Sequence, residues 1–179
     1  MTTAIVLAAG FSRRLGRPKQ LEIIGDETLL HRAARLAREV APTIVVIPAG
    51  APLLRESVRD LDVTIVENVE AGEGIASSIR CGVRACAGDV LLTLCDQPRV
   101  TAAHLRALVA SAAPIAASGY SGIAGVPAFF SAAFLGELLA LQGDAGARRV
   151  IEAHRDIVRV LPFEEAAVDV DDDSPARKD

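Results

Sequence analysis

The chain has 179 residues, of which 51% are hydrophobic and 23% charged, a composition typical of one globular domain over residues 1–179 rather than of a disordered chain. The net charge of −4 argues against a basic groove for duplex DNA. Aromatic residues make up only 3%, with no Trp, which argues against a protein that stacks single-stranded bases on aromatic rings. We therefore expect no nucleic-acid partner.

The sequence carries no signal for a membrane or for export. Its best apolar run, residues 107–117, contains Ser111 and Pro114 and is shorter than the roughly 18 residues that a membrane helix needs. No charged segment precedes the first apolar residues at the N-terminus, so we expect no signal peptide. The three cysteines lack metal-ligand spacing and are expected to be reduced core residues of a cytoplasmic protein: Cys81, Cys86 and Cys95.

Short aliphatic runs alternate with helical patterns along the chain. The runs predict strands at residues 5–8, 43–47, 63–66, 90–94 and 157–161, and residues 125–130 predict a short edge strand, which tolerates Pro127. Apolar residues at helical spacing predict helices around residues 75–86, 105–109, with Thr101 as N-cap, and 135–139. The alternation predicts an α/β fold with three α/β/α layers, in which helices cover both faces of a mostly parallel, twisted, Rossmann-like sheet.

The loop after the first predicted strand combines glycines with cations. Gly10 and Gly16 permit turns that point backbone N–H groups inward, and four basic residues lie within seven positions: Arg13, Arg14, Arg17 and Lys19. Ligands of such sheets bind beyond the carboxyl ends of the strands, so this loop indicates a phosphate site. The alternative is a solvated basic turn. The spacing matches neither a Walker loop nor a dinucleotide-binding fingerprint.

This loop reads L-A-A-G-F-S-R-R-L-G-R-P-K-Q over residues 7–20. It resembles the signature L-A-A-G-x-S-x-R-x-G-x-P-K-Q of nucleotidyltransferases similar to molybdenum cofactor cytidylyltransferase, and the resemblance covers nearly the whole chain. It implies the fold of nucleotide-diphospho-sugar transferases. It also implies that Arg14 and Lys19 bind the triphosphate, and that the nucleotide and its phosphates are held around five further residues: Leu7, Ala8, Ala9, Gly10 and Ser12.

The loop after the third predicted strand enters a helix, with Gly72 and Gly74 before it and serines in its first turns. Taken alone, this is an ordinary helix N-terminus with capping serines. In the resembling family the segment contacts the base. The pattern G-x-x-x-S-I of residues 74–79 is similar to the pattern in cytidylyl-transferring members, whereas guanylyl-transferring relatives carry a proline after the glycine. The resemblance therefore implies CTP rather than GTP, contacted by four residues: Gly74, Ala76, Ser77 and Ser78.

A single carboxylate, Asp96, ends the fourth predicted strand and is followed by Gln97 and Pro98. Carboxylate oxygens suit Mg²⁺, which also takes phosphate oxygens and water, although an Asp here can equally begin a turn. The segment L-C-D-Q-P over residues 94–98 is similar to the family, whose Asp at this position coordinates Mg²⁺.

The acidic tail, residues 169–179, resembles the family's D-[IV]-D-T-P segment irregularly. The second metal ligand there is Asp171 or Asp173, of which we favour Asp173, unless the tail is simply solvated.

Two further segments resemble parts of the family that lie near the acceptor substrate. Gly125 and Pro127 match a G-x-P pattern, and residues 143–148 match G-D-x-G-A-R, with Asp144 a candidate helix cap. Arg148 is a candidate ligand of the acceptor phosphate, or else a surface arginine. The three histidines have no partner spacing and are expected to be structural.

The resemblance implies the transfer of CMP from CTP to the phosphate of molybdopterin, with release of pyrophosphate. Arg14, Lys19 and Mg²⁺ on Asp96 would be catalytic, and a molybdenum-containing oxidoreductase would be the client of the product. Three alternatives stay open: guanylyl or other nucleotidyl transfer to a sugar or alcohol phosphate, a carrier that delivers molybdopterin without catalysis, and NAD(P) binding. The last is disfavoured because the glycine fingerprint is absent.

Overall fold

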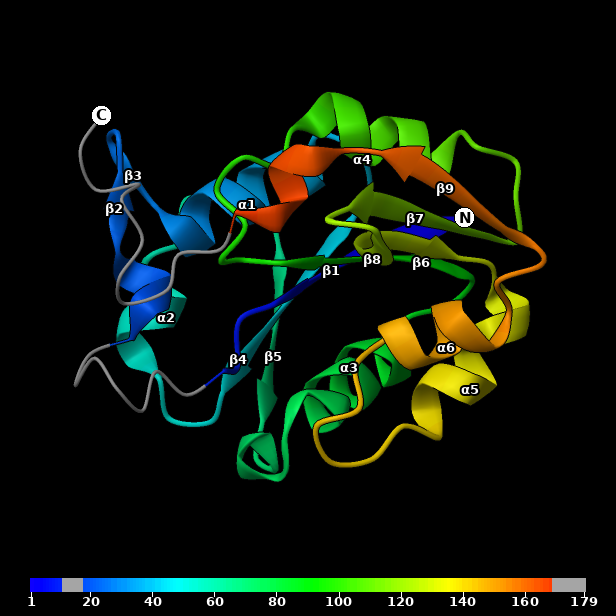
Figure 1. The fold of residues 1–179 in the computed structure, drawn as a ribbon. Coiled ribbons are helices and arrows are strands. Elements are labelled where there is room, and N and C mark those ends of the chain that lie inside the picture. The colour runs from blue at the N-terminus through cyan, green and yellow to red at the C-terminus, as the bar shows by residue number, and fades with distance from the viewer. Residues whose placement is uncertain (11–17, 169–179) are drawn as a thin grey trace.

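A seven-stranded sheet forms the centre of the computed structural model, which describes residues 1–10 and 18–168 (Figure 1). The strand order is β5-β4-β1-β6-β8-β7-β9, and β8 runs antiparallel to its two neighbours while the other pairs are parallel. The strands are β1 (Thr2–Leu7), β4 (Thr43–Pro48), β5 (Thr64–Asn68), β6 (Asp89–Leu94), β7 (Ile115–Tyr120), β8 (Ile123–Phe130) and β9 (Val158–Pro162). A separate hairpin pairs β2 (Ile23–Ile24) with β3 (Glu27–Thr28).

Helices cover both faces of this sheet, as the alternation of strands and helices predicts (Figure 1). One face packs against α1 (Leu29–Arg38), α2 (Pro52–Glu56) and α4 (Ala102–Val109). The other packs against α3 (Ile75–Arg84), α5 (Leu135–Leu139) and α6 (Arg148–Ala153). Because side chains alternate along a strand, Val6 of β1 enters the first core and Ile5 enters the second. The described ranges also contain four short 3₁₀ turns: η1 (Lys19–Leu21), η2 (Ala71–Glu73), η3 (Ala132–Phe134) and η4 (Glu164–Ala167).

The structure confirms the predicted three-layer α/β/α fold, its mostly parallel sheet and the five strands predicted from aliphatic runs. The Thr101 hydroxyl accepts a hydrogen bond from the His104 backbone N–H, which confirms the predicted cap of α4. All three cysteines are free thiols. No helix within the described ranges has the length and apolar character needed to cross a bilayer.

The prediction of an edge strand at residues 125–130 is wrong. β8 lies inside the sheet, between β6 and β7. Its proline is tolerated there because the register of β7 against β8 shifts between Ala117 and Ser118, which leaves Val126 and Pro127 without a paired residue on either neighbouring strand. The true edge on this side is β9, the last strand of the sheet.

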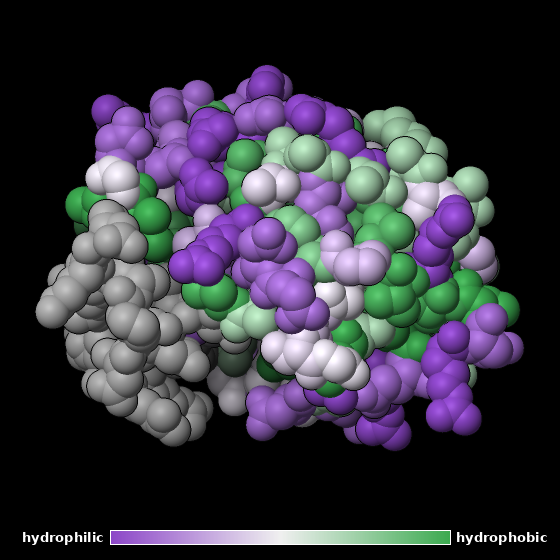
Figure 2. Space-filling view, turned by 45° about the horizontal axis from the view of Figure 1, so that its top comes forward, coloured by the Kyte–Doolittle hydropathy of each residue, from purple (hydrophilic) through white to green (hydrophobic). Residues whose placement is uncertain are grey.

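The prediction that Asp144 caps a helix is also wrong. α6 begins after Ala147, and no side chain caps its first turn. Asp144 instead lies in the pocket described below. Figure 2 shows a face on which hydrophilic and hydrophobic patches lie side by side. Two exposed apolar residues, Ile157 and Val160, lie just before and within the edge strand β9.

Candidate nucleotide-binding site

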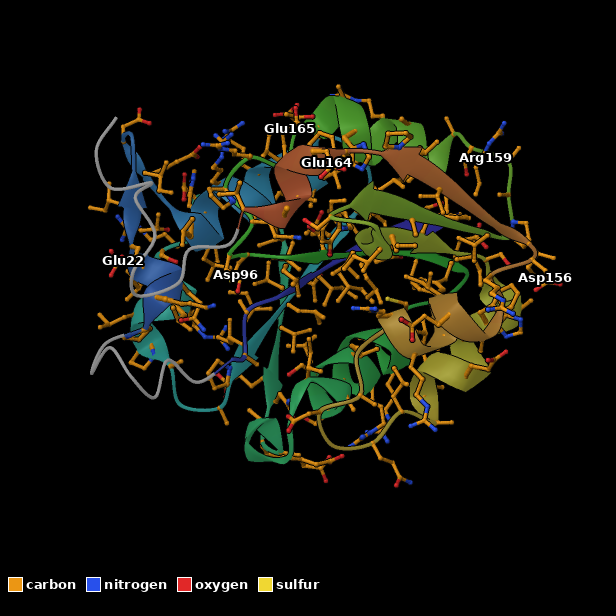
Figure 3. All side chains as sticks on the ribbon, in the orientation of Figure 1. Glu22, Asp96, Asp156, Arg159, Glu164 and Glu165 are labelled. Carbon is orange, nitrogen blue, oxygen red and sulfur yellow. The ribbon has the colours of Figure 1, made fainter. Side chains whose placement is uncertain are left out.

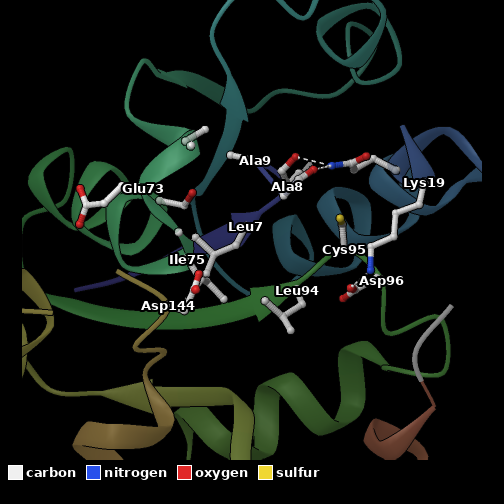
Figure 4. Close-up of a pocket in the computed structure, with 16 residues that line it drawn as sticks. Leu7, Ala8, Ala9, Lys19, Glu73, Ile75, Leu94, Cys95, Asp96 and Asp144 are labelled. Carbon is white, nitrogen blue, oxygen red and sulfur yellow. Dashed lines mark hydrogen bonds and ion pairs between the residues drawn. The ribbon is translucent and has the colours of Figure 1, made fainter. Parts of the chain in front are cut away.

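A pocket of about 440 Å³ lies where β1 and β6 end and α3 begins (Figure 4). Figure 3 shows Asp96 at this end of the sheet and Asp156 and Arg159 at the opposite end. The position agrees with the rule that ligands of parallel sheets bind beyond the carboxyl ends of the strands. Five parts of the chain line the pocket: Leu7–Gly10; Lys19 and Gln20; Ala71–Ile75 with Ser78; Leu94–Asp96; and Asp144.

The first loop is held against the pocket by Gln20, whose side chain is almost fully buried. Its amide nitrogen donates hydrogen bonds to the carbonyl oxygens of Ala8 (2.9 Å) and Gly10 (2.7 Å). These two bonds fix the backbone that the sequence predicts to hold the nucleotide, residues 7–10. The predicted ligands Ser12 and Arg14 lie outside the described residues.

Lys19 and Asp96 meet across the pocket although 77 positions separate them in the sequence. The Lys19 ammonium donates to Asp96 Oδ2 at 2.6 Å, and the two side chains are 24% and 19% exposed. Asp96 Oδ1 is buried, and no hydrogen-bond partner for it lies in the part of the chain that the structure describes. Burial raises the pKa of the adjacent Cys95 thiol, so a neutral thiol flanks the carboxylate.

Asp96 Oδ1, which has no partner among the residues described, fits a divalent cation, because hard cations prefer carboxylate oxygens and a buried acceptor without a partner is costly. Residues 1–10 and 18–168 contain no group of three or more His, Cys, Asp or Glu side chains that could hold a metal by themselves. A cation at Asp96 would therefore need other ligands, such as phosphate oxygens and water. The predicted second carboxylate, Asp173, and its alternative Asp171 lie outside the described residues.

The opposite wall of the pocket is the start of α3. Gly74 precedes the helix with φ 129° and ψ −178°, a conformation that side chains rarely adopt. The Ala76 backbone N–H donates to the Gly143 carbonyl oxygen (3.1 Å), so the loop before α6 packs on the start of α3. Of the predicted base contacts, Gly74 and Ser78 line the pocket, whereas Ala76 and Ser77 do not.

A salt bridge fastens the same two loops. Glu73 accepts hydrogen bonds from the Arg80 guanidinium (2.9 and 2.5 Å) and from the Gly143 backbone N–H (3.1 Å). Arg80 lowers the pKa of Glu73 to about 2, with help from the Gly143 N–H. Arg80 also donates to the Leu141 carbonyl oxygen (2.8 Å). These bonds hold the loop that carries Asp144 beside the pocket.

The predicted acceptor residues lie outside the lining of this pocket. Arg148 is paired with Glu152 on the surface of α6 (2.6 Å). Gly125 and Pro127 belong to β8, where the Ser118 hydroxyl donates to the Pro127 carbonyl oxygen (2.7 Å). Their segment is nevertheless joined to the Asp96 loop, because the buried Gln97 amide donates to the carbonyl oxygens of Val126 (3.1 Å) and Ala166 (2.9 Å).

Sequence reasoning missed eight residues that line the pocket: Gln20, Ala71, Gly72, Glu73, Ile75, Leu94, Cys95 and Asp144. Gln20 closes the signature loop and Cys95 precedes Asp96, so nearness to a motif could have marked both. Asp144 belongs to the G-D-x-G-A-R segment, which the resemblance assigned to the acceptor side. Its place in this pocket depends on how the loop between α5 and α6 packs on α3.

The sequence model of the MobA-like NTP transferase domain matches residues 4–158. The chain belongs to this family. It is 29% identical over 171 residues to the bifunctional protein GlmU of Gluconobacter oxydans, with 94% of the chain aligned, but it spans only 34% of GlmU. It is also 31% identical over 97 residues to a probable molybdenum cofactor guanylyltransferase of Pelotomaculum thermopropionicum, covering 54% of the chain and 45% of that relative.

Solved structures agree with this assignment. A homologue of Mycobacterium tuberculosis Rv0371c, from Mycobacterium sp. strain JC1, superposes with a TM-score of 0.78 at 35% identity, over 91% of this chain and 86% of that one. Mycobacterium tuberculosis Rv0371c in complex with manganese has a TM-score of 0.73 at 31% identity, over 91% and 88% of the two chains. The fold and the family are those of nucleotidyltransferases, which use nucleoside triphosphates.

Proposed function

We propose that this protein transfers CMP from CTP to the phosphate of a molybdopterin-type acceptor, releases pyrophosphate and requires Mg²⁺. The observation that carries the proposal is the meeting of Lys19 and Asp96 in a pocket whose other walls are the Leu7–Gly10 backbone and the start of α3. The choice of CTP and of molybdopterin is supported by the motif resemblance of residues 7–20, 74–79 and 94–98.

The proposed reaction needs no general base, because the acceptor phosphate is already ionised near neutral pH. An oxygen of that phosphate attacks the α-phosphorus of CTP, and a new P–O bond forms. The bond from the α-phosphorus to the oxygen that bridges to the β-phosphorus breaks, and pyrophosphate leaves with the electron pair. The protein has to hold two anions together and stabilise the charge that develops on the leaving group.

Lys19 and Asp96 are the described residues placed for this task. The Lys19 ammonium is a point charge inside the pocket, where it would bind phosphate oxygens. Asp96 would hold Mg²⁺ through Oδ1, its oxygen without a partner among the described residues. When bound, Mg²⁺ would neutralise phosphate charge. The manganese complex of Rv0371c supports the use of a divalent cation at this fold.

Replacement of Asp96 tests the assignment. We expect Asp96→Ala to abolish pyrophosphate release from CTP while the far-UV circular dichroism and the melting temperature stay close to those of the wild type. Asp156→Ala is the matched control, since Asp156 is exposed at the opposite end of the sheet (Figure 3). Pyrophosphate release at the parent rate by Asp96→Ala would refute the role of this carboxylate.

A pyrophosphate-release assay that pairs CTP or GTP with several phosphate acceptors tests the substrates. We expect turnover with CTP and a molybdopterin. Preference for GTP would favour guanylyl transfer, the activity named for the Pelotomaculum relative. Turnover only with a sugar phosphate would replace the acceptor. Binding of molybdopterin with no product from any pair would identify a carrier.

A further inference from the structure

Asn68, at the end of β5, lies behind the pocket and bonds to two serines of α3. It is buried and does not line the pocket. Its amide nitrogen donates to Ser77 Oγ (2.9 Å) and to Ser78 Oγ (3.0 Å). Ser78 is the member of this group that lines the pocket.

The orientation of the Asn68 amide is determined by a third hydrogen bond. Asn68 Oδ1 accepts from the Glu70 backbone N–H (2.9 Å), and a backbone N–H can only donate. Exchanging the amide oxygen and nitrogen would place two donors against each other, so the NH₂ group must face the serines. An NH₂ group can only donate, and both serine hydroxyl oxygens are therefore acceptors.

The hydroxyl hydrogens of Ser77 and Ser78 differ in their hydrogen-bond acceptors. The Ser77 hydroxyl donates to the Gly74 carbonyl oxygen (2.8 Å), so its hydrogen is used inside the protein. For the Ser78 hydroxyl hydrogen, the structure of residues 1–10 and 18–168 records no acceptor. Ser78 lines the pocket, and its oxygen already accepts one hydrogen bond from Asn68, so its hydroxyl hydrogen is the group left to bond a ligand as donor.

We propose that Asn68 is a specificity-determining positioning residue, which makes Ser78 a hydrogen-bond donor toward the nucleobase. This inference rests on the proposed nucleotidyl transfer from CTP. The unprotonated N3 and the neighbouring O2 of cytosine are two adjacent acceptors, whereas N3 of uracil carries a hydrogen. O2 accepts in both bases, so a donor held at Ser78 selects cytosine over uracil by bonding N3, although the two pyrimidines have nearly the same shape.

The decisive variant is Asn68→Asp, which keeps the shape of the side chain and the acceptor for the Glu70 N–H. A carboxylate cannot donate, so Ser78 has to turn its hydrogen toward residue 68 and present an acceptor to the pocket. We expect the Kd of CTP to rise about tenfold, as the loss of one hydrogen bond implies, and the preference for CTP over UTP to fall by a similar factor. At saturating CTP, kcat should remain within about twofold.

Isothermal titration with CTP and UTP measures the preference, and two further variants complete the design. Ser78→Ala removes the donor directly and tests the inference even if Asn68→Asp fails to fold. We expect it to lose the same preference, and the double variant to lose no more. Gln142→Glu, an exposed amide-to-carboxylate change, controls for the added charge and should keep the wild-type CTP-to-UTP ratio.

The outcomes distinguish failure of the proposed function from failure of the inference about Asn68. Wild-type protein that does not bind CTP would overturn the proposed function, and the inference with it. If the wild-type protein prefers CTP over UTP and a folded Asn68→Asp or Ser78→Ala variant keeps this preference, the inference about Asn68 is overturned but the proposed function is not. Loss of stability with an unchanged ratio would show that Asn68 is only structural.

Discussion

Gly74 is a position where the structure leaves no room for a side chain. A Cβ added there would lie within 2.5 Å of Asp144 Oδ1 and closer still to the Gly143 carbonyl oxygen. The positive φ of 129° adds backbone strain of about 1–3 kcal/mol for any other residue. Displacement of Gly143 would also weaken the hydrogen bond from the Ala76 N–H, at a cost of about 1 kcal/mol. We expect Gly74→Ala to lower the free energy of unfolding by about 2–4 kcal/mol.

Urea denaturation measures this change, and CTP titration measures its effect on the pocket, where we expect weaker binding because the collision moves the pocket wall. Gly72→Ala is the matched control. Gly72 lines the same pocket, but it has no positive φ, and an added Cβ would meet no atom within 4 Å. The reasoning is refuted if the two variants unfold at the same urea concentration and bind CTP equally well.

Two further predictions concern charged groups. Hydrogen bonds from Arg35 lower the pKa of Glu27 to about 2, so its carboxylate stabilises the fold above the ordinary value of 4.5, and this contribution is lost as the pH falls from 4.5 toward 2. Between pH 6 and pH 2.5, we expect the free energy of unfolding of the wild type, measured by urea denaturation, to fall by about 1–2 kcal/mol more than that of Glu27→Gln, after allowance for solvent screening. An equal fall in the two proteins would contradict this. Lys19→Met removes the ammonium from the pocket. We expect it to lower kcat/KM for CTP by about 10²–10³-fold in pyrophosphate release, and a change below about threefold would exclude Lys19 from phosphate binding.

The sequence was most informative where structure depends on local pattern. Continuous aliphatic runs predict buried parallel strands because both faces of such strands are covered, and β1 and β6 show this pattern. The rule that ligands bind at the carboxyl ends of strands then predicts that Lys19 and Asp96 lie close together. The structure places their charged groups 2.6 Å apart.

The sequence was least informative where position depends on contacts between distant segments. The apolar run at residues 107–117 contains both the end of α4 and the start of β7. The helical spacing at residues 105–109 predicts α4, but the run does not predict β7. The interior place of β8 depends on the register shift opposite Ser118, which one sequence does not reveal. Asp144 lines the pocket because the loop before α6 packs on α3, and Asn68 lies behind the pocket because the end of β5 contacts α3.

Under the proposed function, the two carboxylate oxygens of Asp96 differ in their contacts, and this decides where a cation could bind. One carboxylate oxygen already receives the Lys19 ammonium, and the other is buried with no partner in the described part of the chain. A cation on Oδ1 would therefore not have to displace Lys19 from Oδ2. In the resting pocket, Lys19 and Asp96 carry opposite charges and offset each other, so phosphates approaching this end would not face an uncompensated carboxylate. A cation held by Asp96 would supply positive charge beside the phosphates, and Lys19 would supply a second positive charge from the other side of the carboxylate.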